Sequence, residues 1–114
     1  MADAARFLPL KPDVFEILVA LAEEPLHGYG LLKVLEGRGV TVAPSLLYRK
    51  LRRLMDDELV GEVHSRRRAG DDPRRRYYRL TSLGLGVARA EAARIVELAR
   101  TREIRRLAEG ASHG

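Results

Sequence analysis

Apolar residues recur three and four positions apart in the first third of the chain, a spacing that predicts two helices. The first begins at Pro12, where the missing N–H of proline costs nothing, and Pro25 ends it. The second covers residues 27–36, and Gly37 and Gly39 follow it as candidates for the left-handed conformation that closes a helix. The apolar positions that carry this spacing are Val14, Ile17, Leu18, Leu21, Tyr29, Leu31, Leu32 and Leu35.

A third predicted helix covers residues 45–58, after Pro44, and its two faces differ in chemistry. The stripe expected to face the core is apolar and consists of Leu47, Leu51, Leu54 and Met55. The opposite stripe is polar and consists of Ser45, Tyr48, Arg49, Arg52 and Asp56. Lys50 and Arg53 lie beside that polar stripe. Ala43, at the expected N-cap, has no side chain that could accept a hydrogen bond from the first turn.

Two alternating stretches then predict a β-hairpin. Residues 59–65 form the first strand, and residues 75–81 form its partner, with Tyr78 and Leu80 facing the core and Tyr77 and Arg79 facing solvent. The turn residues between them are Ala69, Gly70, Asp71, Asp72 and Pro73. The β-branched triplet 40–42 could add a minimal strand. The predicted fold class is therefore mainly α with a small β-hairpin wing, a winged helix-turn-helix.

From Thr81, a good N-cap residue, one long helix is predicted to run to about Glu109. Such a helix of about 27 residues would be about 40 Å long, more than the small domain before it can cover. Its excess apolar surface predicts a homodimer through Ala88, Ala92, Ile95, Val96, Ala99, Ile104 and Leu107. A monomer whose helix folds back onto the core is the alternative. The expected division is residues 1–81 for the winged helix and residues 82–114 for the dimerisation helix and tail.

Composition excludes several other classes. The 114 residues contain no cysteine, and three scattered histidines give no metal-ligand spacing, so neither a metal site nor a cofactor is expected. His27 is expected to cap the second helix rather than bind a ligand. Residues 1–11 are expected to form a tail, although Phe7, Leu8 and Leu10 could pack onto the domain. No signal-peptide layout or long apolar run is present, which favours a cytoplasmic protein. No nucleophile elbow or phosphate-cradling glycine loop indicates an enzyme.

The net charge of +5 favours a polyanionic partner, and two segments concentrate the positive charge. One is the polar side of the third helix. The other is the predicted wing, with Arg66, Arg67, Arg68, Arg74, Arg75 and Arg76 against only Asp71 and Asp72. Neutralising DNA phosphates would relieve the repulsion between these arginines and would make binding steeply salt-dependent. A solvated helix face and a disordered loop are the alternatives that the residues leave open.

The order of these two segments predicts a DNA-binding protein. Arg49 and Arg52 are expected to contact guanine edges in a major groove, while Ser45 and Tyr48 contact phosphate or base. Lys50 and Arg53 are expected to contact the DNA backbone, as are the wing arginines. The main alternative is a protein–protein interaction module that uses the same face for an acidic partner. RNA binding is a weaker option, because stacking platforms for splayed bases are absent from the sequence.

The chain resembles the PadR family of winged-helix transcriptional regulators over about residues 8–108. The matching segments are Ile17-Leu18-Val19-Ala20-Leu21-Ala22, Pro25-Leu26-His27-Gly28-Tyr29, Leu47-Tyr48 with Leu51 and Arg53-Leu54, Arg75-Arg76-Tyr77-Tyr78-Arg79-Leu80-Thr81, and Gly84. The resemblance implies a homodimer joined by its C-terminal helices, repression through a palindromic operator, and release by a small effector. It also implies the small subtype of the family, which has one long dimerisation helix.

The chain departs from the family pattern in two respects. The family commonly has Gly-Thr before Leu-Tyr, whereas Ser45 and Leu46 stand here, so that a hydroxyl is lost and an apolar group that could touch a thymine methyl is gained. The operator sequence is therefore not transferable from relatives. Drug-responsive members stack planar ligands on a tryptophan, and this chain has no tryptophan. The resemblance therefore does not imply an aromatic drug as effector.

Overall fold

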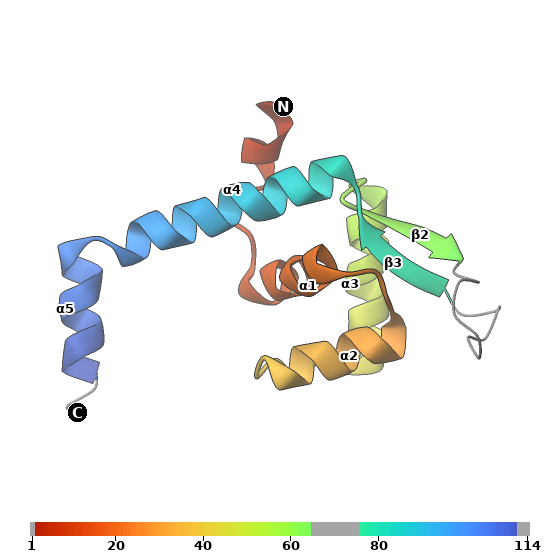
Figure 1. Cartoon of the computed structure of the whole chain (residues 1–114), viewed down its shortest axis with the longest axis horizontal. Coiled ribbons are helices and arrows are strands. Elements are labelled where there is room, and N and C mark those ends of the chain that lie inside the picture. The colour runs from red at the N-terminus through yellow and green to blue at the C-terminus, as the bar shows by residue number, and fades with distance from the viewer. Residues whose placement is uncertain (1, 65–75, 112–114) are drawn as a thin grey trace.

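The computed structural model describes residues 2–64 and 76–111 (Figure 1). In chain order its elements are η1 (Ala2–Phe7), α1 (Pro12–Glu23), β1 (Leu26–His27), α2 (Gly28–Gly37), α3 (Pro44–Asp56), β2 (Val60–His64), β3 (Arg76–Leu80), α4 (Ser82–Ala99) and α5 (Arg102–Ala111). Helices α1, α2 and α3 pack together, the β2–β3 hairpin lies beside α3, and α4 extends across the top of this group (Figure 1). The predicted fold class, a winged helix-turn-helix, is confirmed.

The core lies between the three N-terminal helices, the sheet and the first turns of α4. Its most deeply buried side chains are Ile17, Leu18, Leu31, Leu35, Leu47, Leu51, Leu59 and Val87. The predicted inward stripe of α3 is confirmed, since Leu47, Leu51 and Leu54 are buried and Met55 packs partly buried against them. Burial of one face therefore fixes which face of α3 remains in solvent.

The helix ends follow the local chemistry of the chain. The Nδ1 atom of His27 accepts a hydrogen bond from the N–H of Gly30 at 3.1 Å, so the predicted capping role of His27 is confirmed. Thr81 caps α4 in the same way, with its hydroxyl accepting from the N–H of Gly84 at 2.9 Å. Ala43 makes no side-chain cap, as expected. Helix α3 ends at Asp56, two residues before the predicted end, because Glu58 has a positive φ of 63°.

The three-stranded antiparallel sheet has the order β1-β3-β2. The hairpin pairs Val60 with Leu80 and Val63 with Tyr77, close to the predicted strands. The prediction of a strand at residues 40–42 is wrong, because the third strand is Leu26–His27, which pairs with Tyr78 and Tyr77 of β3. The open edge of β3 receives the segment that leads directly into α2, and Val40 and Val42 pack against the core instead.

The prediction of one helix from residue 81 to about residue 109 is also wrong. The helix stops at Ala99, and α5 turns sharply away from the α4 axis (Figure 1). In a continuous helix the carbonyl of Leu98 would accept from the N–H of Arg102. Here it accepts from Thr101, whose N–H donates at 3.1 Å and whose hydroxyl donates at 2.8 Å. A local hydroxyl thus competes with the helical hydrogen bond and the chain bends.

The N-terminal segment packs onto the domain, the alternative to a tail that Phe7, Leu8 and Leu10 left open. It forms a short 3-10 helix that packs on α4, with Ala4, Phe7, Leu8 and Leu10 partly buried against the core. The N–H of Leu10 donates to the Oε2 atom of Glu91 at 2.8 Å. Glu91 also accepts from Arg94, and only 1% of Glu91 is exposed. The buried carboxylate of Glu91 therefore joins the N-terminal segment to the middle of α4.

Candidate nucleic-acid interface

Helix α3 presents its cationic side to solvent, as the sequence predicts. Ser45, Arg49 and Arg52 are all exposed, on the side opposite the buried leucines. Within the described residues, neither Arg49 nor Arg52 has an ion-pair or hydrogen-bond partner, which leaves both guanidinium groups available to an anion. Arg53 is also exposed and reaches Asp57 one turn later, with 3.4 Å between its Nε atom and the carboxylate oxygen. An exposed pair of this length contributes little stability and can be exchanged for a phosphate.

Lys50 is placed differently from its neighbours. Its Nζ atom lies 2.7 Å from Oδ2 of Asp13, at the first turn of α1, and its side chain is mostly covered. The hydrogen bond from Lys50 lowers the pKa of Asp13 below its ordinary value of 3.8, against the opposing effect of burial. Lys50 therefore joins α3 to α1, and its ammonium group is not part of the exposed surface that Arg49 and Arg52 form.

Tyr48 fits over the start of α2 because residue 28 is glycine. A Cβ atom at Gly28 would overlap the hydroxyl and ring of Tyr48. Tyr48 also acts on Tyr78 of β3, whose pKa is raised by burial first and then by Glu62 and Tyr48. Tyr48 is half-exposed and lies where α2, α3 and the hairpin meet. The close approach of Tyr48 thus explains why glycine stands between His27 and Tyr29.

The hairpin begins beside α3, and one of its six predicted arginines can be placed. Arg76 is exposed, and its Nη1 atom lies 3.1 Å from Oε2 of Glu62 on the adjacent strand. The other predicted wing arginines, Arg66, Arg67, Arg68, Arg74 and Arg75, lie outside the described residues. Helix α3 and β2 contact each other, so the base of the hairpin adjoins the cationic helix.

An aromatic group at the start of α2 was missed in the sequence. The ring of His27 stacks against Tyr29, with centroids 6.5 Å apart, and meets Tyr77 edge-on at 5.3 Å. Lys33 lies over the outer ring, 5.4 Å from the centroid of Tyr29. The spacing of Tyr29 and Lys33 by one helical turn was the available signal. Tyr29, one of the apolar residues that carry the helical spacing, is mostly exposed and does not belong to the core.

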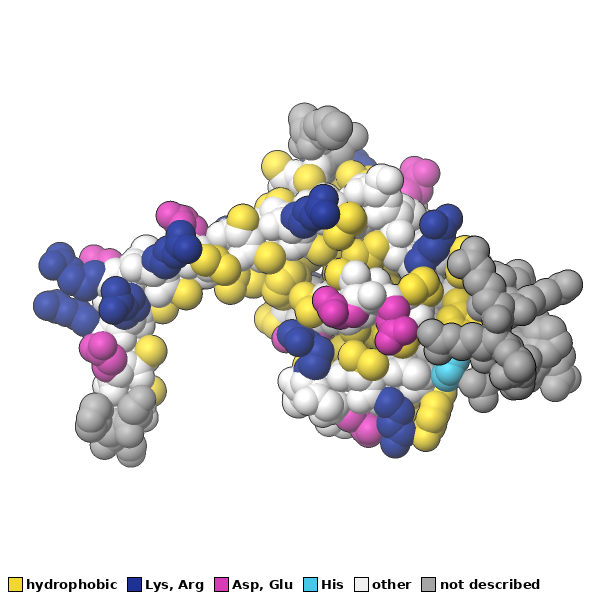
Figure 2. Space-filling view, in the orientation of Figure 1, with side chains coloured by type: hydrophobic (Ala, Val, Ile, Leu, Met, Phe, Trp, Pro, Cys, Tyr) yellow, Lys and Arg dark blue, Asp and Glu magenta, His cyan; other side chains and the backbone are white. Residues whose placement is uncertain are grey.

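The predicted dimerisation residues fall into two groups. Ala88 is 6% exposed and belongs to the core of its own protomer, so it is not available to a second copy. Every residue from 92 to 111 is exposed, a range that contains Ala92, Ile95, Val96, Ala99, Ile104 and Leu107. Figure 2 shows apolar side chains along the lower side of α4 and on the side of α5 that faces the body of the molecule. The structure therefore exposes a long apolar surface far from α3.

Other kinds of site have less support. An open hollow of about 330 Å³ lies between the end of α1 and the start of α4, with Leu21, Arg79 and Leu85 among its lining residues. Over residues 2–64 and 76–111, no three His, Asp or Glu side chains gather in a way that could hold a metal ion. No helix in the same two ranges is both long and apolar enough to cross a bilayer.

Together, the cationic helix α3, the β-hairpin beside it and the projecting C-terminal helices define a winged helix-turn-helix protein. The PadR-like transcriptional regulator family model matches residues 17–90, and the chain belongs to this family. No curated protein sequence matches the chain.

Three solved structures illustrate the likeness. A PadR family transcriptional regulator from Eggerthella lenta is 33% identical, with a TM-score of 0.58 and 73% of each chain covered. A PadR-like transcription factor from Bacteroides fragilis is 27% identical, with a TM-score of 0.64, covering 75% of this chain and 81% of that one. Bacillus subtilis PadR, solved in complex with operator DNA, is 20% identical, with a TM-score of 0.59, covering 70% of this chain and 46% of that one.

Proposed function

We propose that this chain is a homodimeric, sequence-specific DNA-binding repressor. The observation that carries the proposal is the exposure of Arg49 and Arg52, which have no partner among the described residues, on a helix whose opposite side is the core of the domain. A major groove admits one helix of this kind, and arginine makes bidentate contacts to guanine O6 and N7. Bacillus subtilis PadR, which shares the fold, was solved with operator DNA, and this supports the same class of ligand.

The remaining residues of the predicted DNA-binding set divide by their contacts. Ser45, Tyr48 and Arg53 are exposed at the edges of the reading face and would bond phosphate or base. Arg76, with the arginines at positions 66–68 and 74–75, would contact the backbone beside the groove. Lys50 is withdrawn from this set, because its ammonium group already neutralises Asp13. Phosphate contacts of this kind position a protein and carry little sequence information.

The exposed apolar residues of α4 and α5 are the reason for proposing a homodimer. A monomer would leave Ile95, Val96 and Leu107 in water, which is unfavourable in proportion to the apolar area. Two-fold pairing through these helices would place two α3 helices on successive major grooves, with half-sites about 34–36 Å apart. A palindromic operator follows from that symmetry. By analogy with the family, the proposal also includes repression, release by a small effector and action in the cytoplasm.

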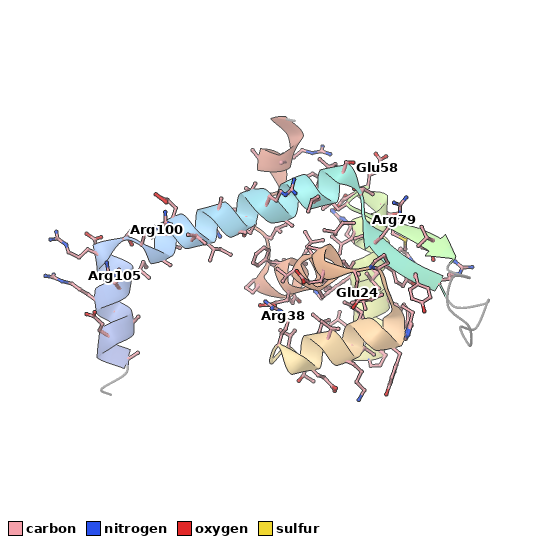
Figure 3. All side chains as sticks on the ribbon, in the orientation of Figure 1. Glu24, Arg38, Glu58, Arg79, Arg100 and Arg105 are labelled. Carbon is pink, nitrogen blue, oxygen red and sulfur yellow. The ribbon has the colours of Figure 1, made fainter. Side chains whose placement is uncertain are left out.

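The proposal is tested by selecting bound sites from a random DNA pool and measuring affinity by fluorescence anisotropy. Arg49→Ala and Arg52→Ala should each weaken the selected site by about 1–3 kcal/mol while leaving random DNA almost unaffected. Arg100→Ala is the matched control, because it removes the same charge at the far end of α4 (Figure 3). Equal losses on selected and random DNA would show that α3 does not read bases.

The salt dependence separates the wing from the helix. Replacing two wing arginines should weaken all DNA alike and should reduce the slope of log affinity against log salt by about 0.9 for each lost phosphate contact. If no DNA is bound in a salt-sensitive manner, the same face serves an acidic protein partner and the proposal fails.

A further inference from the structure

Leu46 is an aliphatic side chain on the exposed side of α3. It retains 38% exposure, whereas Leu47, Leu51 and Leu54 of the same helix are 0–4% exposed. The core therefore does not require a leucine at position 46. On this side of the helix its companions are Arg49 and Arg53, three and seven positions later, which places all three along one edge.

The position of Leu46 relative to Arg49 fits a base-pair step. Three residues of an α-helix advance about 4.5 Å along its axis, and successive base pairs are about 3.4 Å apart. When the guanidinium of Arg49 reaches a guanine edge, the side chain of Leu46 therefore lies over a neighbouring base pair. Both side chains belong to the first two turns of α3.

Only one base of ordinary DNA offers an apolar group in the major groove. Thymine carries a methyl group at C5, whereas guanine, adenine and cytosine present hydrogen-bond donors and acceptors there. Cytosine methylated at C5 places a methyl group at the same position of the ring. Contact between Leu46 and either methyl removes apolar surface from water on both sides.

We propose that Leu46 reads the C5 methyl group of a pyrimidine next to the guanine that Arg49 contacts. The inference rests on the proposed function and adds to it a preference for thymine, or for 5-methylcytosine, at one position of each half-site. Burial of one methyl group corresponds to about a four-fold change in affinity. Methylation of cytosine at this position therefore changes how tightly the regulator binds.

The test is a uracil scan of the selected site, in which each thymine is replaced in turn by a base that differs only in the missing methyl group. For the unmodified protein, one position in each half-site should lose about four-fold in affinity. Placing cytosine there should weaken binding, and 5-methylcytosine should recover most of the loss that is due to the methyl group.

Leu46→Ala identifies the residue responsible. This variant should bind the thymine site as weakly as the unmodified protein binds the uracil site, and it should no longer distinguish the two. Arg49→Ala is the matched comparison, because it should weaken both sites and retain the discrimination. Thermal unfolding measures whether each variant is folded. We expect Leu46→Ala to fold because position 46 is exposed.

The possible failures are distinguishable. A flat uracil scan with salt-sensitive, sequence-specific binding intact overturns the role of Leu46 and leaves the proposed function standing. Persistence of the methyl effect in Leu46→Ala overturns the assignment to this residue. Absence of DNA binding overturns both.

Discussion

The backbone N–H of Leu10 donates a hydrogen bond to Oε2 of Glu91 at 2.8 Å, although 81 positions separate the two residues. The same carboxylate accepts two hydrogen bonds from Arg94, one turn later on α4. This arrangement holds the N-terminal segment against α4 near the point where α4 leaves the core. It therefore fixes the direction of the helix on which the proposed dimer depends.

Glu91→Ala should destabilise the fold by about 1–3 kcal/mol, because the N–H of Leu10 is left without its acceptor in a largely covered position. Chemical denaturation followed by circular dichroism measures the change. The matched control is Glu97→Ala, which removes an exposed carboxylate that lies 3.6 Å from Arg100 on the same helix. That control should change stability by less than about 0.5 kcal/mol.

Stability should also depend on pH through Glu91. The hydrogen bond from Arg94 is the main reason that the pKa of Glu91 lies below its ordinary value of 4.5, and it outweighs the opposing effect of burial. Because the pKa of Glu91 is lower in the folded state, ionised Glu91 contributes its full stabilisation at any pH above its pKa in the unfolded chain. This stabilisation is lost as the pH falls through the pKa of Glu91 in the folded state.

The unfolding free energy of Glu91→Gln should therefore fall less than that of the unmodified protein between about pH 5 and about pH 3. Denaturation curves across this range give the comparison. Parallel losses in the two proteins would show that other carboxylates cause the acid sensitivity.

Gly28 and Tyr48 should behave as a coupled pair. Gly28→Ala places a methyl group where the Tyr48 ring lies, so it should cost about 1–3 kcal/mol and displace Tyr48 from the edge of the reading face. In a Tyr48→Ala background the same substitution should cost less than about 0.5 kcal/mol, because the obstructing ring is gone. A double-mutant cycle of unfolding free energies measures the coupling, and additive costs would contradict the contact.

Gly84 and Gly86, two positions apart on α4, should respond to alanine in opposite ways. A Cβ atom at Gly84 would overlap the backbone carbonyl of Leu59, which cannot move aside as a side chain can. Gly84→Ala should therefore destabilise by more than about 3 kcal/mol or prevent folding. Nothing lies within 4 Å of the corresponding atom at Gly86, so Gly86→Ala should stabilise by about 0.4–1 kcal/mol. Thermal unfolding of the two variants decides this.

The sequence was informative where the signal was periodic and local. The outer face of α3 could be predicted because its buried leucines repeat at helical spacing, and the caps at His27 and Thr81 because they depend on residues three positions away. The pairing of Lys50 with Asp13 depends on how α1 lies against α3, which no local pattern records.

The wrong predictions of a strand at residues 40–42 and of a single C-terminal helix also arise from contacts that a local sequence pattern does not record. A β-branched triplet at residues 40–42 has strand propensity, but position beside β3 decides which segment pairs. The alanine-rich pattern after Thr81 favours one helix, and it does not show that the hydroxyl of Thr101 bonds the carbonyl of Leu98. The burial of Glu91 likewise depends on the N-terminal segment, whose Leu10 lies 81 positions away in the chain.

The bend between α4 and α5 raises the question of which helix forms the proposed dimer interface, and we expect both to contribute. Ile95 on α4 and Leu107 on α5 are both exposed, and the bend gives their helices different directions. If a second copy covers both, Ile95→Asp and Leu107→Asp should each shift the protein toward monomer, because a carboxylate buried at an apolar interface is costly to desolvate. Analytical ultracentrifugation over a dilution series measures the shift.

Arg105→Asp is the matched control for these variants, since it places the same carboxylate on α5 at a position occupied by a charged residue (Figure 3). It should leave the dimer nearly intact. The two monomeric variants should lose affinity for the full palindrome far more than for a single half-site, because two linked contacts become one. A Leu107→Asp protein that remains dimeric would mean that α4 alone forms the interface and that α5 lies outside it.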